Sequence, residues 1–228
     1  MYNFISWLIY VIFIITVIRT NFLANDINYQ YLINAQSLIG PTGNFVTPSP
    51  FITPKDNFTF GLHRFIIGVN YGIKSSMETG INLSLRQFSS LVADEIYESN
   101  SVIFHIKYNF LNQYQKKNIL DFSLGSYSDT FYIVIGKKLF YLTNTSIQLG
   151  TDYSKNKLCY FVVFIQQMKY SFFICEYKSR MSEVNFGWRV LLAPDVKLDI
   201  FLRSKGNLKD WFSIFIFGLT IATNYTTG

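Results

Sequence analysis

The chain has 228 residues, of which 50% are hydrophobic, 18% are aromatic and 15% are charged, and its formal net charge is +6. This length fits one domain that can bury a core or close a sheet on itself. The basic residues are spread along the chain in runs no longer than two, as at Lys116 and Lys117. Because a nucleic-acid footprint needs basic residues clustered on one face, no nucleic-acid partner is expected.

Residues 1–24 predict a secretory signal peptide. An almost unbroken apolar run from Phe4 to Ile18 is followed by Arg19 and the polar stretch "NDINYQ". Such a run is shorter than the roughly 20 residues of a membrane-spanning helix and is typical of a signal sequence, here ending near Ala24. An uncleaved membrane anchor is the alternative. In both cases the rest of the chain is expected to leave the cytoplasm.

The next segment, residues 25–56, is rich in proline and glycine. Four of the five prolines of the chain, Pro41, Pro48, Pro50 and Pro54, lie here. Proline cannot donate a hydrogen bond to a β-ladder, so this segment is expected to be extended but to lie outside the main sheet.

From residue 57 onward, apolar and polar side chains alternate. In "SVIFHIKYNF", residues 101–110, Phe104 and Ile106 face one way while His105 and Lys107 face the other. Most of these segments are close to the roughly 9 to 11 residues of a tilted strand that crosses a bilayer. The pattern predicts about twelve strands, at residues 57–63, 65–73, 76–86, 101–110, 118–126, 130–137, 139–152, 157–167, 169–178, 183–192, 195–202 and 211–223.

The two faces of these strands differ in composition. The polar face mixes glycine, asparagine and serine with balanced charges, and the apolar face is heavy in phenylalanine, tyrosine and tryptophan. A soluble sandwich would instead present mainly lysine and glutamate to water. We therefore predict an all-β fold, a closed antiparallel transmembrane β-barrel of about twelve strands over residues 57–228, in a bacterial outer membrane. A secreted soluble β-sandwich or barrel that acts as a binding module is the alternative.

In such a barrel the polar face lines the lumen. The proline-rich segment is expected at the periplasmic rim or inside this lumen. The charges can form a pore lining for polar solutes or cross-strand ion pairs that fill a narrow lumen, and the second interpretation is favoured. The predicted lumen-lining residues are Glu78, Asn82, Arg86, His105, Lys107, Asp121, Asp152, Glu176, Lys178, Glu183, Asn185, Arg189, Lys197 and Asp199.

The sequence offers little for catalysis or metal binding. Its two histidines, His63 and His105, fall on polar faces without a metal-ligand neighbour, and "GPTGN" lacks the ending of a phosphate-binding loop. Cys159 and Cys175 do not form a C-x-x-C motif, and two isolated apolar thiols are favoured over a disulfide between adjacent strands. No cofactor, no metal and no enzymatic activity are expected. A hydrolase that uses one histidine, a serine and an acid is a less favoured alternative.

Three stretches carry a resemblance to a known family. They are "SLIGPTGNFVTPSPFITPKDNFTFGLHRF", "GVNYGIKSSMETGINLSL" and "ICEYKSRMSEVNFGWRVLLAPDVKLDIFL". Together they resemble the YjbH-like family of bacterial outer-membrane barrels, in which an acidic-Tyr pair precedes an N-x-G-x-R strand. Glu176, Tyr177, Asn185, Gly187 and Arg189 match that pattern. The resemblance implies a non-enzymatic barrel that supports envelope biogenesis or the passage of surface polysaccharide or small solutes. Its implied partners are the outer-membrane lipid, the barrel-assembly machinery and polysaccharide.

Overall fold

The structure is a computed structural model. It describes residues 34–63, 66–84, 102–112, 120–139, 144–168, 170–193, 195–204 and 215–223. The predicted signal peptide lies outside the described residues. Among the residues that are described, no helix is long and apolar enough to cross a membrane.

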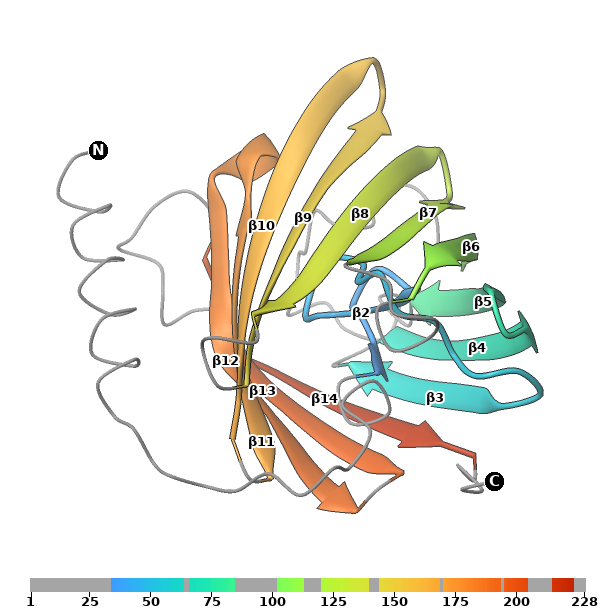
Figure 1. Ribbon diagram of the computed structural model, residues 1–228, viewed down its shortest axis with the longest axis vertical. Coiled ribbons are helices and arrows are strands. Elements are labelled where there is room, and N and C mark those ends of the chain that lie inside the picture. Colours follow the sequence, from blue (N-terminus) through green and yellow to red (C-terminus); the bar gives the residue numbers. More distant parts are fainter. Residues whose placement is uncertain are drawn as a thin grey trace, which may run out of the picture.

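Twelve antiparallel strands form a closed barrel, which confirms the predicted fold class (Figure 1). Each strand pairs with the next one along the chain, and the last pairs with the first, from Gly218↔His63 to Ala222↔Thr59. Of the alternative, a soluble β-sandwich or barrel, the sandwich is therefore wrong. The strands are β3 (Phe58–His63), β4 (Ile66–Lys74), β5 (Met77–Ser84), β6 (Val102–Leu111), β7 (Asp121–Tyr127), β8 (Thr130–Leu139), β9 (Thr145–Ser154), β10 (Lys157–Gln167), β11 (Ser171–Lys178), β12 (Glu183–Ala193), β13 (Val196–Ser204) and β14 (Phe215–Ala222).

The two ends of the barrel differ. At the end that we call the terminal end, β3 begins and β14 ends, and β4 turns into β5. At the opposite end, the far end, the connections 85–101 and 205–214 join β5 to β6 and β13 to β14. The short turn between β9 and β10 is also at the far end. Its central residues Lys155 and Asn156 both have positive φ, as in the two-residue turns whose twist matches that of the strands they join.

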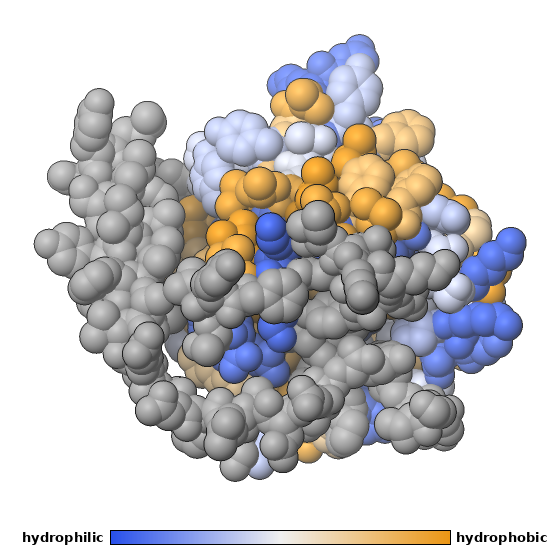
Figure 2. Space-filling model, in the orientation of Figure 1, coloured by the Kyte–Doolittle hydropathy of each residue, from blue (hydrophilic) through white to orange (hydrophobic). Residues whose placement is uncertain are grey.

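The outer wall of the barrel is apolar. Large hydrophobic side chains are exposed on it, and they appear as a broad orange area in Figure 2. Aromatic pairs lie near both ends, with ring centroids 4.6 Å apart for Phe58 and Tyr71 at the terminal end and 6.0 Å apart for Tyr160 and Tyr177 toward the far end. A transmembrane β-barrel presents to lipid such an apolar wall, flanked by aromatic residues at both ends.

Residues 34–54, which we call the inner segment, lie inside the barrel (Figure 1). Every residue from 34 to 51 is buried. The segment forms only the two-residue strands β1 (Ala35–Gln36) and β2 (Thr42–Gly43), which pair with each other and not with the barrel. Of the two positions expected for the proline-rich segment, the structure shows the lumen. Its prolines remove no hydrogen bond from the barrel ladder.

The inner segment forms a loop that enters and leaves through the terminal end. Near one end of it, the Lys197 ammonium at the start of β13 donates to the backbone carbonyl of Asn34, and the side-chain amide of Asn34 donates to the Ile52 carbonyl over 2.9 Å. At its other end, the amide of Asp56 donates to the Gly72 carbonyl over 2.8 Å. Between these points the chain turns back on itself, with the Leu38 amide donating to the Phe45 carbonyl over 2.8 Å.

Candidate functional site

The candidate site is the lumen together with the inner segment that fills it. On one wall, the Glu78 carboxylate of β5 accepts hydrogen bonds from the Thr42 amide (2.9 Å), the Thr42 hydroxyl (2.7 Å) and the Thr53 amide (2.6 Å). The Lys107 ammonium of β6 lies 3.3 Å from the same carboxylate and donates to the carbonyls of Thr42 and Phe51. One ion pair on the wall thus holds both arms of the loop.

A second carboxylate holds the tip of the loop from β11. Glu176 accepts hydrogen bonds from the amides of Phe45 (2.6 Å) and Val46 (3.0 Å) and from the Thr47 hydroxyl (3.1 Å). It also accepts one from the Asn185 side chain of the neighbouring strand β12, over 3.3 Å. Charge-assisted bonds of this kind are about twice as strong as those between neutral groups.

The Arg189 guanidinium of β12 binds the loop through its carbonyls. It donates to the carbonyls of Gly43 and Asn44, each over 3.0 Å. The same guanidinium forms a bidentate ion pair with the Asp199 carboxylate of β13, with N–O distances of 2.7 and 2.8 Å. Arg189 is fully buried and Asp199 is 1% exposed. Because a buried charge is costly unless it is paired and hydrogen-bonded, Asp199 is what allows Arg189 to sit in the lumen.

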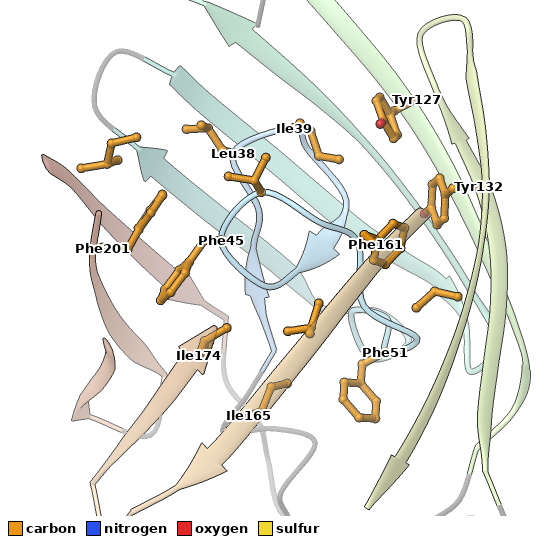
Figure 3. Close-up of a cluster of buried hydrophobic side chains, with 14 of the residues drawn as sticks. Leu38, Ile39, Phe45, Phe51, Tyr127, Tyr132, Phe161, Ile165, Ile174 and Phe201 are labelled. Carbon is orange, nitrogen blue, oxygen red and sulfur yellow. The ribbon is translucent and has the colours of Figure 1, made fainter. Parts of the chain in front are cut away.

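Apolar side chains line other parts of the lumen, and some of them lie on β11 and β13, the strands that carry Glu176 and Asp199. Leu38, Ile39, Phe45 and Phe51 of the inner segment form one cluster with inward side chains of the strands (Figure 3). The rings of Phe45 and Phe201 are stacked with their centroids 4.3 Å apart. The wall contributes, among others, Tyr132, Val134, Phe161, Val163, Ile165, Phe172, Ile174 and Phe201. The inner segment and the barrel therefore share one hydrophobic core.

Two further ion pairs lie toward the far end. The Lys178 ammonium of β11 is 2.6 Å from the Asp152 carboxylate of β9, and the Arg203 guanidinium of β13 is 2.6 Å from the Glu183 carboxylate of β12. The strands that carry these four residues extend past the tip of the loop at the far end.

The structure places the predicted lumen-lining residues that it describes in five groups. The residues that bind the inner segment directly are Glu78, Asn82, Lys107, Glu176, Arg189 and Lys197. Asn185 and Asp199 bind some of those residues in turn. His105 borders Gly40; Asp152, Lys178 and Glu183 belong to the far-end pairs; and Asp121 is buried at the start of β7. Arg86 lies outside the described residues.

Gly40 shows how closely the loop fits the wall. Its φ of +123° is a conformation that side-chain-bearing residues rarely adopt, and a Cβ there would lie 3.2 Å from atoms of both Asn82 and His105. Glycine is the residue type that suits this position.

Several residues of the site were not among those predicted. Asn109 and Ser123 donate to the Pro50 carbonyl, and Gln148 accepts from the Asn44 side chain over 2.9 Å. The alternation already placed Asn109 on the polar face. The sequence "KLCYFVVFIQQ" indicates the apolar inner wall. This strand is apolar on both faces, so it must contact a second apolar surface in addition to lipid.

The two cysteines and the two histidines all lie on strands of the barrel. Both cysteines are free, Cys159 buried and Cys175 partly exposed. His63 lies 3.4 Å from the Asp199 carboxylate and His105 lies 3.8 Å from that of Glu78. No cluster that could hold a metal ion occurs within the described ranges.

No protein-family model and no curated protein matches the sequence. Among solved structures, the KdgM porin is similar over 74% of this chain and 98% of its own, with 8% identity and a TM-score of 0.44. A triple mutant of Rhodopseudomonas blastica porin is similar over 69% of this chain and 54% of its own, with 11% identity and a TM-score of 0.38. These scores are low, so the assignment of the fold rests on the strand pairing of this chain.

The closed barrel and its apolar outer wall are those of a protein that contacts a lipid bilayer. A closed barrel leaves no strand edge unpaired, which is the condition for strands to cross hydrocarbon. This architecture agrees with the predicted location in a bacterial outer membrane.

Proposed function

We propose that the chain is a non-enzymatic outer-membrane barrel that passes small solutes or surface polysaccharide, and that its inner segment keeps the lumen closed until it is displaced. One observation carries this proposal. The inner segment fills the lumen, yet all of its bonds to the wall are non-covalent, and its strands do not join the barrel sheet.

The lengths of the connections at the two ends of the barrel indicate which end faces the periplasm. Barrels of this class have short periplasmic turns and longer extracellular loops. The longer connections 85–101 and 205–214 belong to the far end. The terminal end, through which the inner segment enters, is then the periplasmic end. We propose that residues 1–24 are the signal peptide, that residues 25–56 are a proline- and glycine-rich segment whose residues 34–54 close the lumen, and that residues 57–228 are the barrel that the assembly machinery inserts.

The proposed role in envelope biogenesis draws on the resemblance to the YjbH-like family. Two of the residues that carry it, Glu176 and Arg189, bind the tip of the inner segment. That tip belongs to the stretch "GPTGNFVT", which also belongs to the resemblance. Sequence features far apart in the chain thus meet at one place, which supports treating barrel and segment as one functional unit.

A channel suits the lumen better than an active site does. While the inner segment is in place, the side chains of His63 and His105 are at most 2% exposed, so a substrate in solution does not reach them in the closed barrel. The charged residues of the wall include both signs, mostly in pairs. A lumen of this kind favours polar solutes without strong selection for one sign of charge.

Single-channel recording in a planar bilayer tests the proposal. We expect the intact chain to give only rare, brief current steps. A variant in which residues 36–53 are replaced by a short Gly-Ser linker should give steady steps, provided that it migrates as a folded barrel on an unheated gel. Steady full conductance of the intact chain would contradict closure by the inner segment. A folded linker variant without conductance would contradict the channel function.

A further inference from the structure

The wall of the lumen recognises the inner segment mainly through its backbone. The carboxylates of Glu78 and Glu176 accept hydrogen bonds from backbone amides, at Thr42 and Thr53 in one case and at Phe45 and Val46 in the other. Every residue except proline carries such a backbone amide. These contacts therefore do not depend on the identity of the side chain.

The positively charged side chains of the wall bind the backbone carbonyls of the same segment. Arg189 donates to the two successive carbonyls of Gly43 and Asn44. The Lys107 ammonium donates to those of Thr42 and Phe51. Donors and acceptors on the wall are thus spaced to match the groups of consecutive peptide units.

The inner segment itself contributes no charge. Residues 34–54 contain no aspartate, glutamate, lysine, arginine or histidine. Every bond to a charged group of the wall therefore uses a neutral partner. Its side chains that contact the wall are apolar or neutral polar: Phe45 stacks on Phe201, Phe51 lies in the same cluster, and the hydroxyls of Thr42 and Thr47 donate to Glu78 and Glu176.

We infer that the lumen is a binding site for an uncharged peptide that folds back into a loop, and that it holds such a peptide without a covalent link to the barrel. The inner segment is the resident ligand of this site. The inference rests on the proposed function, because it takes the inner segment to be a removable element. A polysaccharide fits the observations less well, because sugars lack the succession of amide and carbonyl groups that Glu176 and Arg189 bind on adjacent residues.

The test cuts the chain after it has folded. The turn at Lys55 and Asp56 is exposed, with side chains 62% and 66% accessible, so a protease recognition sequence can be inserted between Asp56 and Asn57. The full chain is folded in detergent and then cleaved. A fluorescent synthetic peptide of residues 34–56 is added, and its binding to the barrel is followed by fluorescence anisotropy.

We expect the cut segment either to stay with the barrel through gel filtration or to be replaced saturably by the labelled peptide. Two peptide variants separate backbone from side-chain recognition. Val46→Pro removes the amide that donates to Glu176, whereas Val46→Ala keeps it and shortens the side chain. The proline peptide should bind at least about tenfold more weakly than the alanine peptide, because a bond to a charged group is lost.

Loss of the cut segment from a barrel that stays folded, with no binding of the labelled peptide, would overturn the inference. Equal affinities of the two variant peptides would overturn backbone recognition. Displacement of the labelled peptide by a neutral oligosaccharide such as maltohexaose, at a lower concentration than by unlabelled peptide, would assign the site to sugars instead. Conductance of the emptied barrel is a separate readout: its absence would remove the proposed channel function, whereas anisotropy would still report peptide binding.

Discussion

Replacing Ile133 with arginine is expected to lower the free energy of unfolding by about 2 to 4 kcal/mol when the barrel is measured in lipid. Ile133 lies within β8, and its side chain is 46% exposed on the outer wall. It has apolar Leu124 beside it on β7. An arginine here would be placed in hydrocarbon, where its charge loses its hydration.

Leu158→Arg is the matched control. Leu158 is more exposed, at 72%, but it is the second residue of β10 and lies next to the far end. Near the interface a charge reaches headgroups and water, so the expected cost is only about 0 to 1 kcal/mol. Urea titrations of both variants in the same lipid give the two values. Equal costs would mean that the outer wall does not face a bilayer.

Glu176→Ala is expected to be among the most damaging single substitutions inside the barrel. It removes the acceptor of the Phe45 and Val46 amides while leaving both amides buried. Each buried donor that loses its partner costs about 1 to 3 kcal/mol, so the loss of stability should be on the order of 3 kcal/mol. Glu176→Gln keeps one acceptor oxygen and should cost less.

The same substitution in the linker variant, which lacks residues 36–53, is the control for this explanation. Without the inner segment there are no amides of Phe45 and Val46 to satisfy. Glu176→Ala should then cost little, because the carboxylate faces the water of the emptied lumen and no longer holds the inner segment. Unfolding free energies of the four proteins form a double-mutant cycle. A cost of Glu176→Ala that is the same with and without the inner segment would show that this carboxylate does not hold it.

The strands could be predicted from the sequence because side-chain alternation is a local property. Phe104 and Ile106 are exposed while His105 and Lys107 are buried, as the period of two requires. Two-residue turns such as Lys155 and Asn156 leave little freedom in pairing. Once about twelve such strands are counted, closure into a barrel follows from the need to pair both edges in hydrocarbon.

The contents of the lumen could not be predicted in the same way. Phe45 meets Glu176 across 131 positions of sequence, and no local pattern relates the two. The run "KLCYFVVFIQQ" is apolar on both faces, so alternation cannot say which side faces lipid. The prolines indicated that the opening segment stays out of the ladder, but its place in the lumen depends on cavities that only the closed barrel creates.

The position of the inner segment is the central claim, and cysteine cross-linking tests it most directly. In a chain with Cys159 and Cys175 changed to serine, Phe45→Cys is combined with Phe201→Cys, because these two rings stack in the lumen at 4.3 Å. The control combines Phe45→Cys with Ile200→Cys, the next position on β13, whose side chain points to the other face of the wall. The folded barrel is treated with a short bis-maleimide, which bridges the gap that remains when two stacked rings are each replaced by a cysteine, a gap that a direct disulfide need not span. The 45–201 pair should be cross-linked in most molecules and the 45–200 pair in few. Equal yields for the two pairs, or no cross-link at 45–201 in a folded barrel, would contradict the account.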